Sequence, residues 1–205
     1  MAAHVSRMRR RFGLGPADRV LQFAALAFDA SIDQIFPALS CGAALVLPEH
    51  GLVAPATLLP LLARHGVTLA NLPPAYFGEL VAELTERDGE VPRDLRLMVL
   101  GGDRVRPGDV DRFASRCPDV AVLNAYGPTE TTVTTTVADL PLGLTGAPPI
   151  GRAVGTGRCT CWTVRWPRCR WVRWASCSSV ARSWRGLSGP AGCDGGAVRA
   201  GPVRW

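Results

Sequence analysis

Lysine is absent from this sequence of 205 residues, and all 23 of its basic side chains are arginines. A catalytic role that needs a lysine side chain is therefore excluded for this chain on its own. No apolar run reaches the roughly 18 residues of a membrane span, and no secretory signal follows the basic start, so we expect a cytoplasmic protein. The three histidines (His4, His50 and His65) have no cysteine partners at metal-ligand spacing, which argues against a zinc site.

Positive net charge is missing from the first three quarters of the chain. Residues 1–152 carry 14 arginines and 16 acidic side chains, a net charge of −2. Residues 153–205 carry nine arginines and one acidic residue, Asp194, a net charge of +8. All six tryptophans and five of the seven cysteines also lie in this tail, which has no helical or strand period. An overall charge of +6 normally suggests an acidic partner, but here the basic character belongs to the tail alone, so neither a nucleic-acid nor a membrane partner is expected.

Apolar runs and helical periods alternate about five times between residues 18 and 124. Strands are expected at 19–27, 43–47, 67–72, 95–100 and 120–124, and helices at 32–39, 58–66, 73–87 and 107–116. This alternation predicts an α/β fold, a parallel sheet with helical crossovers. Ligands of such sheets bind outside the carboxyl ends of the strands. Residues 1–17 are interpreted as a polar, arginine-rich lead.

The most informative stretch is Asn124-Ala125-Tyr126-Gly127-Pro128-Thr129-Glu130-Thr131-Thr132. It follows an apolar strand and turns at Gly127-Pro128. Threonine hydroxyls can donate to phosphoryl oxygens, and a carboxylate suits Mg²⁺, which binds through one or two carboxylates plus substrate phosphates. The alternative is a polar loop that only ends the strand.

The whole string resembles a signature of the adenylate-forming, AMP-binding enzymes, and most closely the adenylation domains of nonribosomal peptide synthetases. The resemblance covers residues 18 to about 155 and implies a partial N-terminal (large) subdomain of such an enzyme. It implies ATP-dependent activation of an amino acid: the carboxylate attacks the α-phosphate, aminoacyl-AMP forms, and the acyl group passes to a carrier-protein thiol. ATP or AMP and Mg²⁺ are the implied ligands.

The resemblance also implies a substrate pocket. Phe28-Asp29-Ala30-Ser31 matches a family motif whose aspartate pairs with the α-ammonium of the amino acid, so Asp29 favours an amino acid over a fatty acid; alternatively, Asp29 is only a helix cap. The implied pocket positions are Asp29, Ala30, Asp33, Asn71, Val99, Gly101, Ala125, Val133 and Thr134. Because a buried carboxylate needs a partner, we hypothesise that Asp33 faces a basic side chain of the lysine or ornithine kind. The alternative places Asp33 on an exposed helix turn.

The nucleotide positions implied by the same resemblance are Gly101, Gly102, Asn124, Ala125, Tyr126, Gly127 and Thr129. Glycine lets a flat ring lie against the main chain, and Tyr126 offers an aromatic face for adenine. Thr129 is assigned to the α-phosphate and Glu130 to Mg²⁺. Family members also have a glycine-rich phosphate loop upstream, a later aspartate for the ribose, and a catalytic lysine. None of these is found here, so we expect an internal fragment that does not adenylate alone.

Three interpretations of the whole chain follow. The first is an adenylation-domain fragment, comprising a lead at 1–17, a partial domain at 18–155 and a frame-shifted, poorly ordered tail at 156–205. The frame shift is inferred because GC-rich codons assumed for the tail, read from the third base, resemble what the family carries after Pro149-Ile150-Gly151-Arg152. The second is a non-catalytic module that binds an amino acid or adenylate. The third is a nucleic-acid-binding protein that acts through its basic tail.

Overall fold

The computed structural model describes residues 1–48, 53–86, 92–144 and 146–154, together with the backbone of 159–166 and 169–177. Its centre is a seven-stranded sheet in the order β2-β1-β3-β4-β5-β6-β7. The strands are β1 (Arg19–Leu21), β2 (Ala44–Val46), β3 (Leu69–Leu72), β4 (Leu97–Gly101), β5 (Ala121–Tyr126), β6 (Thr136–Asp139) and β7 (Arg152–Ala153). The first five are parallel, while β6 and β7 are antiparallel additions at one edge. The predicted α/β fold with helical crossovers is confirmed.

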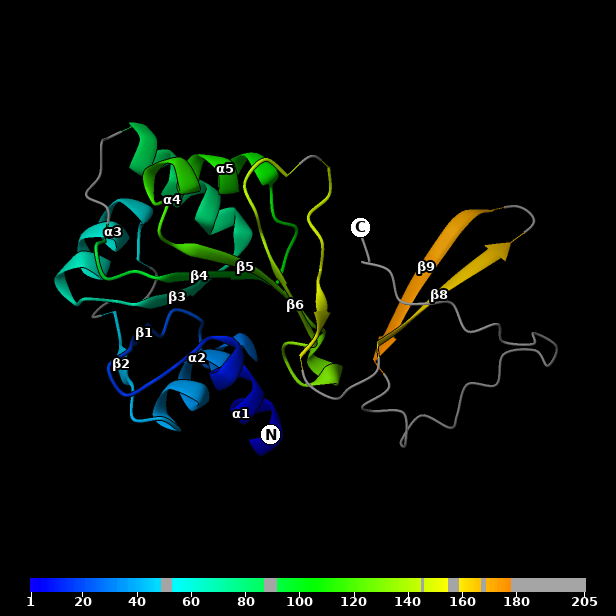
Figure 1. Cartoon of the computed structure of the whole chain (residues 1–205), viewed down its shortest axis with the longest axis horizontal. Helices are drawn as coiled ribbons and strands as arrows, with labels where there is room; N and C mark the ends of the chain where they lie inside the picture. Colours follow the sequence, from blue (N-terminus) through cyan, green and yellow to red (C-terminus); the bar gives the residue numbers. More distant parts are fainter. Residues whose placement is uncertain (49–52, 87–91, 145, 155–158, 167–168, 178–205) are drawn as a thin grey trace.

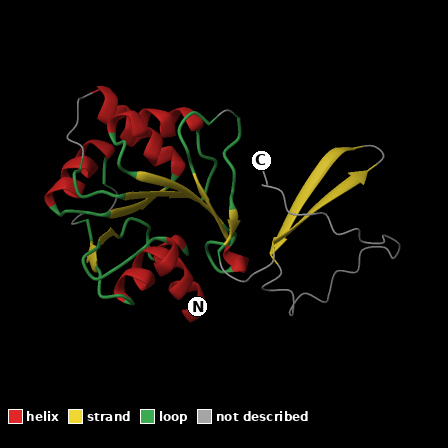
Figure 2. Ribbon diagram, in the orientation of Figure 1, coloured by secondary structure: helices red, strands yellow, loops and turns green. Residues whose placement is uncertain are grey.

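Helices cover both faces of the sheet (Figures 1 and 2). On one face, α3 (Pro55–Arg64), α4 (Pro74–Glu86) and α5 (Pro107–Arg116) enclose a large apolar core. On the other face, α1 (Ala2–Arg11) and α2 (Ala30–Leu39) enclose a second, smaller core. The sheet is therefore the middle of three layers, and each helical layer encloses its own core.

The larger core explains why the predicted helices form where they do. Helix α5 has the predicted bounds because Pro107 suits a first helical position, and Val110 and Phe113 then fall on one buried face. Phe113 meets Phe77 of α4 edge-on, with ring centroids 5.1 Å apart. The helices α3, α4 and α5 therefore cover one face of the sheet, and α1 and α2 cover the opposite face.

Helix α1 was not expected, because residues 2–11 include four arginines. The structure shows that this segment is helical and contributes to the smaller core. Met8 is fully buried and Phe12 is 2% exposed. Arg96, which directly precedes β4, holds the end of α1. Its Nη1 donates to the carbonyl of Phe12 at 3.0 Å, and its Nη2 donates to the carbonyl of Gly13 at 3.1 Å. The predicted polar lead is thus a packed helix.

Strand β1 is shorter than predicted. It ends at Leu21 because the backbone N–H groups of Phe23 and Ala24 donate to the side-chain oxygen of Gln34, both at 2.9 Å, instead of continuing a ladder. Strands β6 and β7 were not predicted at all.

The structure describes two strands in the tail. An antiparallel pair, β8 (Cys159–Trp166) and β9 (Cys169–Cys177), forms a second sheet of its own. Aromatic and β-branched residues recur in both segments and have high strand propensity, which accounts for the pairing. The rest of the predicted tail, residues 178–205 included, lies outside the described residues. Among the helices that the structure describes, none has the length and apolar character needed to cross a membrane.

Candidate functional site

The carboxyl ends of neighbouring parallel strands bring four predicted pocket positions to one face of the sheet. Successive residues of a strand point to opposite faces, and Val99 of β4 belongs to the core beneath α1 and α2, whereas its strand neighbours belong to the opposite core. The register pairs Asn71 with Val99 and Gly101 with Ala125. Alternation therefore places these four positions on the face that α1 and α2 cover.

Helix α2 carries the next group of predicted residues. Asp29 is the N-cap residue of the helix by position, but its side chain makes no capping hydrogen bond. Ala30 begins the helix and is half-buried. Gln34, 1% exposed, donates from Nε2 to the carbonyl of Asn71 at 3.0 Å. This amide therefore fixes the start of α2, and Asp29 with it, beside the end of β3.

Asp33 lies one turn after Asp29, and only 2% of its surface is exposed. The alternative that placed it on an exposed turn is therefore wrong. Its Oδ1 atom lies 2.5 Å from Nε2 of His4, a residue of α1 that is itself buried. Its Oδ2 atom is buried and has no hydrogen-bond partner within the described part of the chain. Asp33 is thus a buried carboxylate with one oxygen paired and the other still able to accept.

The loop after β5 has an unusual backbone. A Cβ atom on Gly127 would lie 1.9 Å from the carbonyl oxygen of Val133, so only glycine fits there. Thr132 and Val133 have φ angles of 70° and 60°, which are rare for β-branched residues. Such strained positions cluster at ligand-binding sites. Val133 and Thr134, both predicted pocket residues, are buried where this loop returns to the sheet.

Between Gly127 and Thr132, a short 3-10 helix, η1 (Thr129–Thr131), presents the two residues predicted to meet phosphate and metal. Thr129 and Glu130 are both exposed. Among the described residues, no group of three or more histidines, cysteines or carboxylates gathers to hold a metal ion by itself. Glu130 is thus a single carboxylate, which suits a Mg²⁺ ion that takes its other ligands from phosphates and water.

One pocket brings together one predicted substrate residue and one predicted nucleotide residue, while the other predicted positions do not line it. It has a volume of about 310 Å³ and is lined by Leu26, Ala27, Phe28, Asp29, Ile32 and Thr129. Asp29 approaches from the start of α2, and Thr129 from the loop after β5. A carboxylate that can bind an ammonium group and a hydroxyl that can bind a phosphate therefore line the same cavity, although 100 residues separate them in the sequence.

The glycine turn after β4 is open where a planar ring would have to approach. Gly102 has a φ of 89°, and no atom lies within 4 Å of the position that a Cβ would occupy. At Gly101 a Cβ would lie 3.0 Å from the carbonyl oxygen of Ala125, so the two strand ends are close together. Both glycines therefore have a local reason to lack a side chain.

Two other residues predicted to bind the nucleotide lie near the end of β5. Tyr126 is the half-buried last residue of the strand, and its carbonyl accepts from the backbone N–H of Thr135 at 2.9 Å. Asn124 is buried, and its Nδ2 donates to the carbonyl of Pro149 at 2.8 Å. The side-chain amide of Asn124 therefore joins β5 to the segment before β7 and is not free to turn toward a ligand without losing that bond.

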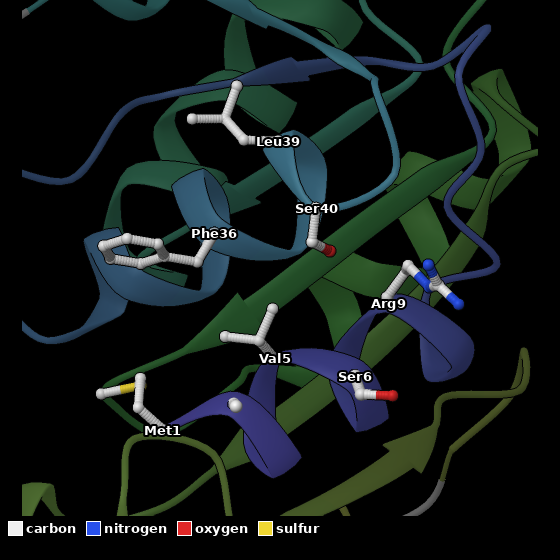
Figure 3. Close-up of a pocket in the computed structure, with 8 residues that line it drawn as sticks. Met1, Val5, Ser6, Arg9, Phe36, Leu39 and Ser40 are labelled. Atoms are coloured by element: carbon white, nitrogen blue, oxygen red, sulfur yellow. The ribbon is translucent and has the colours of Figure 1, made fainter.

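A larger groove, of about 650 Å³, lies between α1 and α2 (Figure 3). The figure shows Met1 and Val5 of the first helical segment facing Phe36 and Leu39 across it. No predicted site residue lines this groove. It is a feature of the helical layer, separate from the pocket that contains Asp29 and Thr129.

Two residues that contact predicted site residues were missed from the sequence. His4 meets Asp33 across 29 positions, and Gln34 meets Asn71 across 37. No spacing rule signals either contact, because both depend on which helices share a face of the sheet.

Comparisons with known proteins agree with this geometry. The family model "AMP-binding enzyme" matches residues 1–161. An isonitrile lipopeptide synthase of Streptomyces coeruleorubidus is 39% identical over 155 residues, which are 74% of this chain and 10% of that protein. The chain thus spans about a tenth of the length of that relative, and 2% of a probable nonribosomal peptide synthetase, CymA, of Salinispora arenicola.

Solved structures show the same fold. The nonribosomal peptide synthetase FmoA3 in its α-methyl-L-serine-AMP-bound form has a TM-score of 0.73 at 32% identity, covering 78% of this chain and 19% of that one. Its AMPPNP-bound form has a TM-score of 0.70 at 32% identity, with 77% and 17% covered. PA1221, which contains adenylation and carrier (PCP) domains, has a TM-score of 0.65 at 30% identity, with 72% and 25% covered. From the family match and the shared fold, we conclude that the chain belongs to the AMP-binding enzyme family and is similar to the adenylation domains of nonribosomal peptide synthetases.

Proposed function

We propose that residues 1–154 supply the amino acid and adenylate face of an adenylation domain. The parent reaction is attack of an amino acid carboxylate on the α-phosphate of ATP, which gives aminoacyl-AMP and releases pyrophosphate. The acyl group then passes to the thiol of a carrier protein. The observation that carries this proposal is the single pocket shared by Asp29 and Thr129. Aminoacyl-AMP carries an ammonium group and a phosphate in one molecule, as these two side chains require.

The substrate side of the proposal assigns the α-ammonium group to Asp29. A charge-assisted hydrogen bond of this kind is worth about 1.5–3 kcal/mol. The side chain of the substrate amino acid is assigned to the face formed by Asn71, Val99, Gly101 and Ala125. The residues at the border of this face are Ala30, Asp33, Val133 and Thr134. FmoA3, to which the chain is similar, has been solved with an aminoacyl-AMP, which supports this class of ligand.

The nucleotide side assigns adenine to the open turn at Gly101 and Gly102 and to Tyr126. Gly127 turns the chain so that Thr129 meets the α-phosphate. Asn124 and Ala125 are assigned to the nucleotide site through the backbone of β5, not through their side chains. Glu130 fits Mg²⁺ as one carboxylate ligand, and the ion, when bound, would neutralise charge on the phosphates.

The side chain of the amino acid is proposed to be basic, because Asp33 retains an unpaired buried oxygen. A carrier protein is the proposed acceptor, supported by the adenylation and PCP domains together in PA1221. Since the chain contains no lysine, we expect it to bind adenylates without catalysing amino-acid-dependent pyrophosphate exchange.

The proposal is tested by calorimetric titration of the full chain with non-hydrolysable aminoacyl sulfamoyl adenosines, one carrying ornithine and one norleucine. Each is paired with an analogue that lacks the α-amino group. We expect Asp29→Asn to weaken the aminoacyl analogues by about 10- to 100-fold and to leave the deamino analogues unchanged.

Asp119→Asn is the matched control, because Asp119 is an exposed carboxylate away from the pocket. It should leave all four affinities unchanged. The proposed function is wrong if the wild-type chain binds neither aminoacyl analogue, or if Asp29→Asn weakens both kinds of analogue equally.

A further inference from the structure

The contact between His4 and Asp33 was not predicted from the sequence. It joins α1 to α2 through two side chains that are 8% and 2% exposed. The Oδ1 atom of Asp33 lies 2.5 Å from Nε2 of His4, while Oδ2 is buried without a partner. A buried acceptor that lacks a hydrogen bond lowers stability, and more so when it is charged. This cost disappears if a bound ligand supplies the missing donor.

The position of Asp33 relates this unpaired oxygen to the proposed substrate site. Residues four apart on a helix lie on the same face, so Asp33 follows Asp29 along α2. Gln34 ties this part of α2 to the carbonyl of Asn71. Further along the helix, Ala38 packs in the same core as Val99. The carboxylate therefore lies in the layer that covers the proposed pocket face.

We propose that His4 is a positioning residue for substrate specificity, which holds Oδ1 of Asp33 so that Oδ2 receives an ammonium group at the end of the substrate side chain. This inference rests on the proposed function. The contact with His4 occupies Oδ1 and leaves Oδ2 as the buried carboxylate oxygen that can accept from a ligand. A donor at the end of the substrate side chain would fill it, which selects basic amino acids over apolar ones of the same shape.

The length of the substrate side chain can be matched by an isosteric pair of probes. Ornithine and norleucine have side chains of the same length and differ by an ammonium in place of a methyl group. Calorimetry on the full chain with the ornithyl and norleucyl sulfamoyl adenosines gives an affinity ratio for each variant. In the wild type we expect ornithine to be favoured by about tenfold or more.

Variants then separate the roles of the two residues. Asp33→Asn should bring the ratio close to one. His4→Leu removes the hydrogen bond and should reduce the ratio severalfold, whereas His4→Gln, whose Nε2 can still donate, should recover much of it. His65→Leu is the matched control, because His65 lies outside both helices, and it should leave the ratio unchanged.

A ratio measured within one variant is insensitive to a loss of folded protein, because such a loss weakens both analogues equally. If His4→Leu does not fold, the affinity ratios of the wild type, Asp33→Asn and His4→Gln still test whether Asp33 selects the ornithyl analogue. Equal affinities of the wild type for the two analogues would overturn this inference and leave the proposed function standing. A ratio that changes in Asp33→Asn but not in His4→Leu would overturn the role of His4 alone. Failure of the wild type to bind either analogue would overturn the proposed function itself.

Discussion

Asp18 shows how one carboxylate can hold the amino-terminal ends of several elements together. Its Oδ1 accepts from Nε of Arg96 at 2.9 Å and from the hydroxyl of Thr68 at 2.6 Å, and its Oδ2 accepts from the backbone N–H of Gly15 at 2.9 Å. Burial alone would raise the pKa of Asp18, but these hydrogen bonds outweigh burial and lower the pKa below its ordinary value of 3.8. Asp18→Asn should therefore cost about 1–3 kcal/mol of unfolding free energy near neutral pH.

This contribution has a defined pH dependence. Because the pKa is lower in the folded state, the stabilisation is complete above pH 3.8 and is lost as the pH falls through the folded-state pKa. Urea unfolding at pH 6 and at pH 3 should show the difference between wild type and Asp18→Asn shrinking at the lower pH. Asp119→Asn, at an exposed carboxylate, should change stability by no more than about 0.5 kcal/mol at neutral pH. A constant difference for Asp18→Asn would contradict the assignment.

At the scale of elements, α1 is the helix whose contribution is least evident from composition. Met8 of α1 is fully buried against the sheet, whereas Arg10, two residues later, is exposed. We expect Met8→Ala to lower the unfolding free energy by about 2–5 kcal/mol and Arg10→Ala to change it by less than about 0.5 kcal/mol. Denaturant titrations of both variants measure this. Equal, small effects would mean that Met8 does not anchor α1 to the sheet.

The same helix illustrates what can be predicted from the sequence. Helix α5 was predicted correctly because its own residues contain a start signal and an apolar face. In α1 the buried positions, His4 and Met8, include a polar residue and are surrounded by arginines, so the local pattern indicated a polar segment. Its structure is set by the sheet face that it covers. The pocket positions were named from the family resemblance and stay a prediction, whereas the hydrogen bond between His4 and Asp33 depends on how two helices pack.

At the scale of the molecule, charge and family similarity divide the chain at nearly the same place. Residues 1–152 have a net charge of −2 and residues 153–205 have +8. The family match ends at residue 161. Within the seven-stranded sheet, the last ladder residue is Ala153 of β7, and the backbone N–H of Val154 donates to the carbonyl of Thr135 at 2.9 Å. The frame shift proposed for the tail stays a prediction, which the nucleotide sequence of the gene can check.

If the tail has no selected role, then a chain that ends at Val154 should retain the properties of the folded part. We expect its midpoint of thermal unfolding and its affinity for the ornithyl analogue to match those of the full chain, because every described residue that lines the proposed site precedes residue 155. Nucleic-acid binding that falls steeply with salt should be found only in the full chain, since it requires the arginines after residue 152. Loss of analogue binding on truncation would contradict this division and assign the tail to the folded domain. Salt-dependent nucleic-acid binding by the shortened chain would instead place the basic surface within residues 1–154, against their net negative charge.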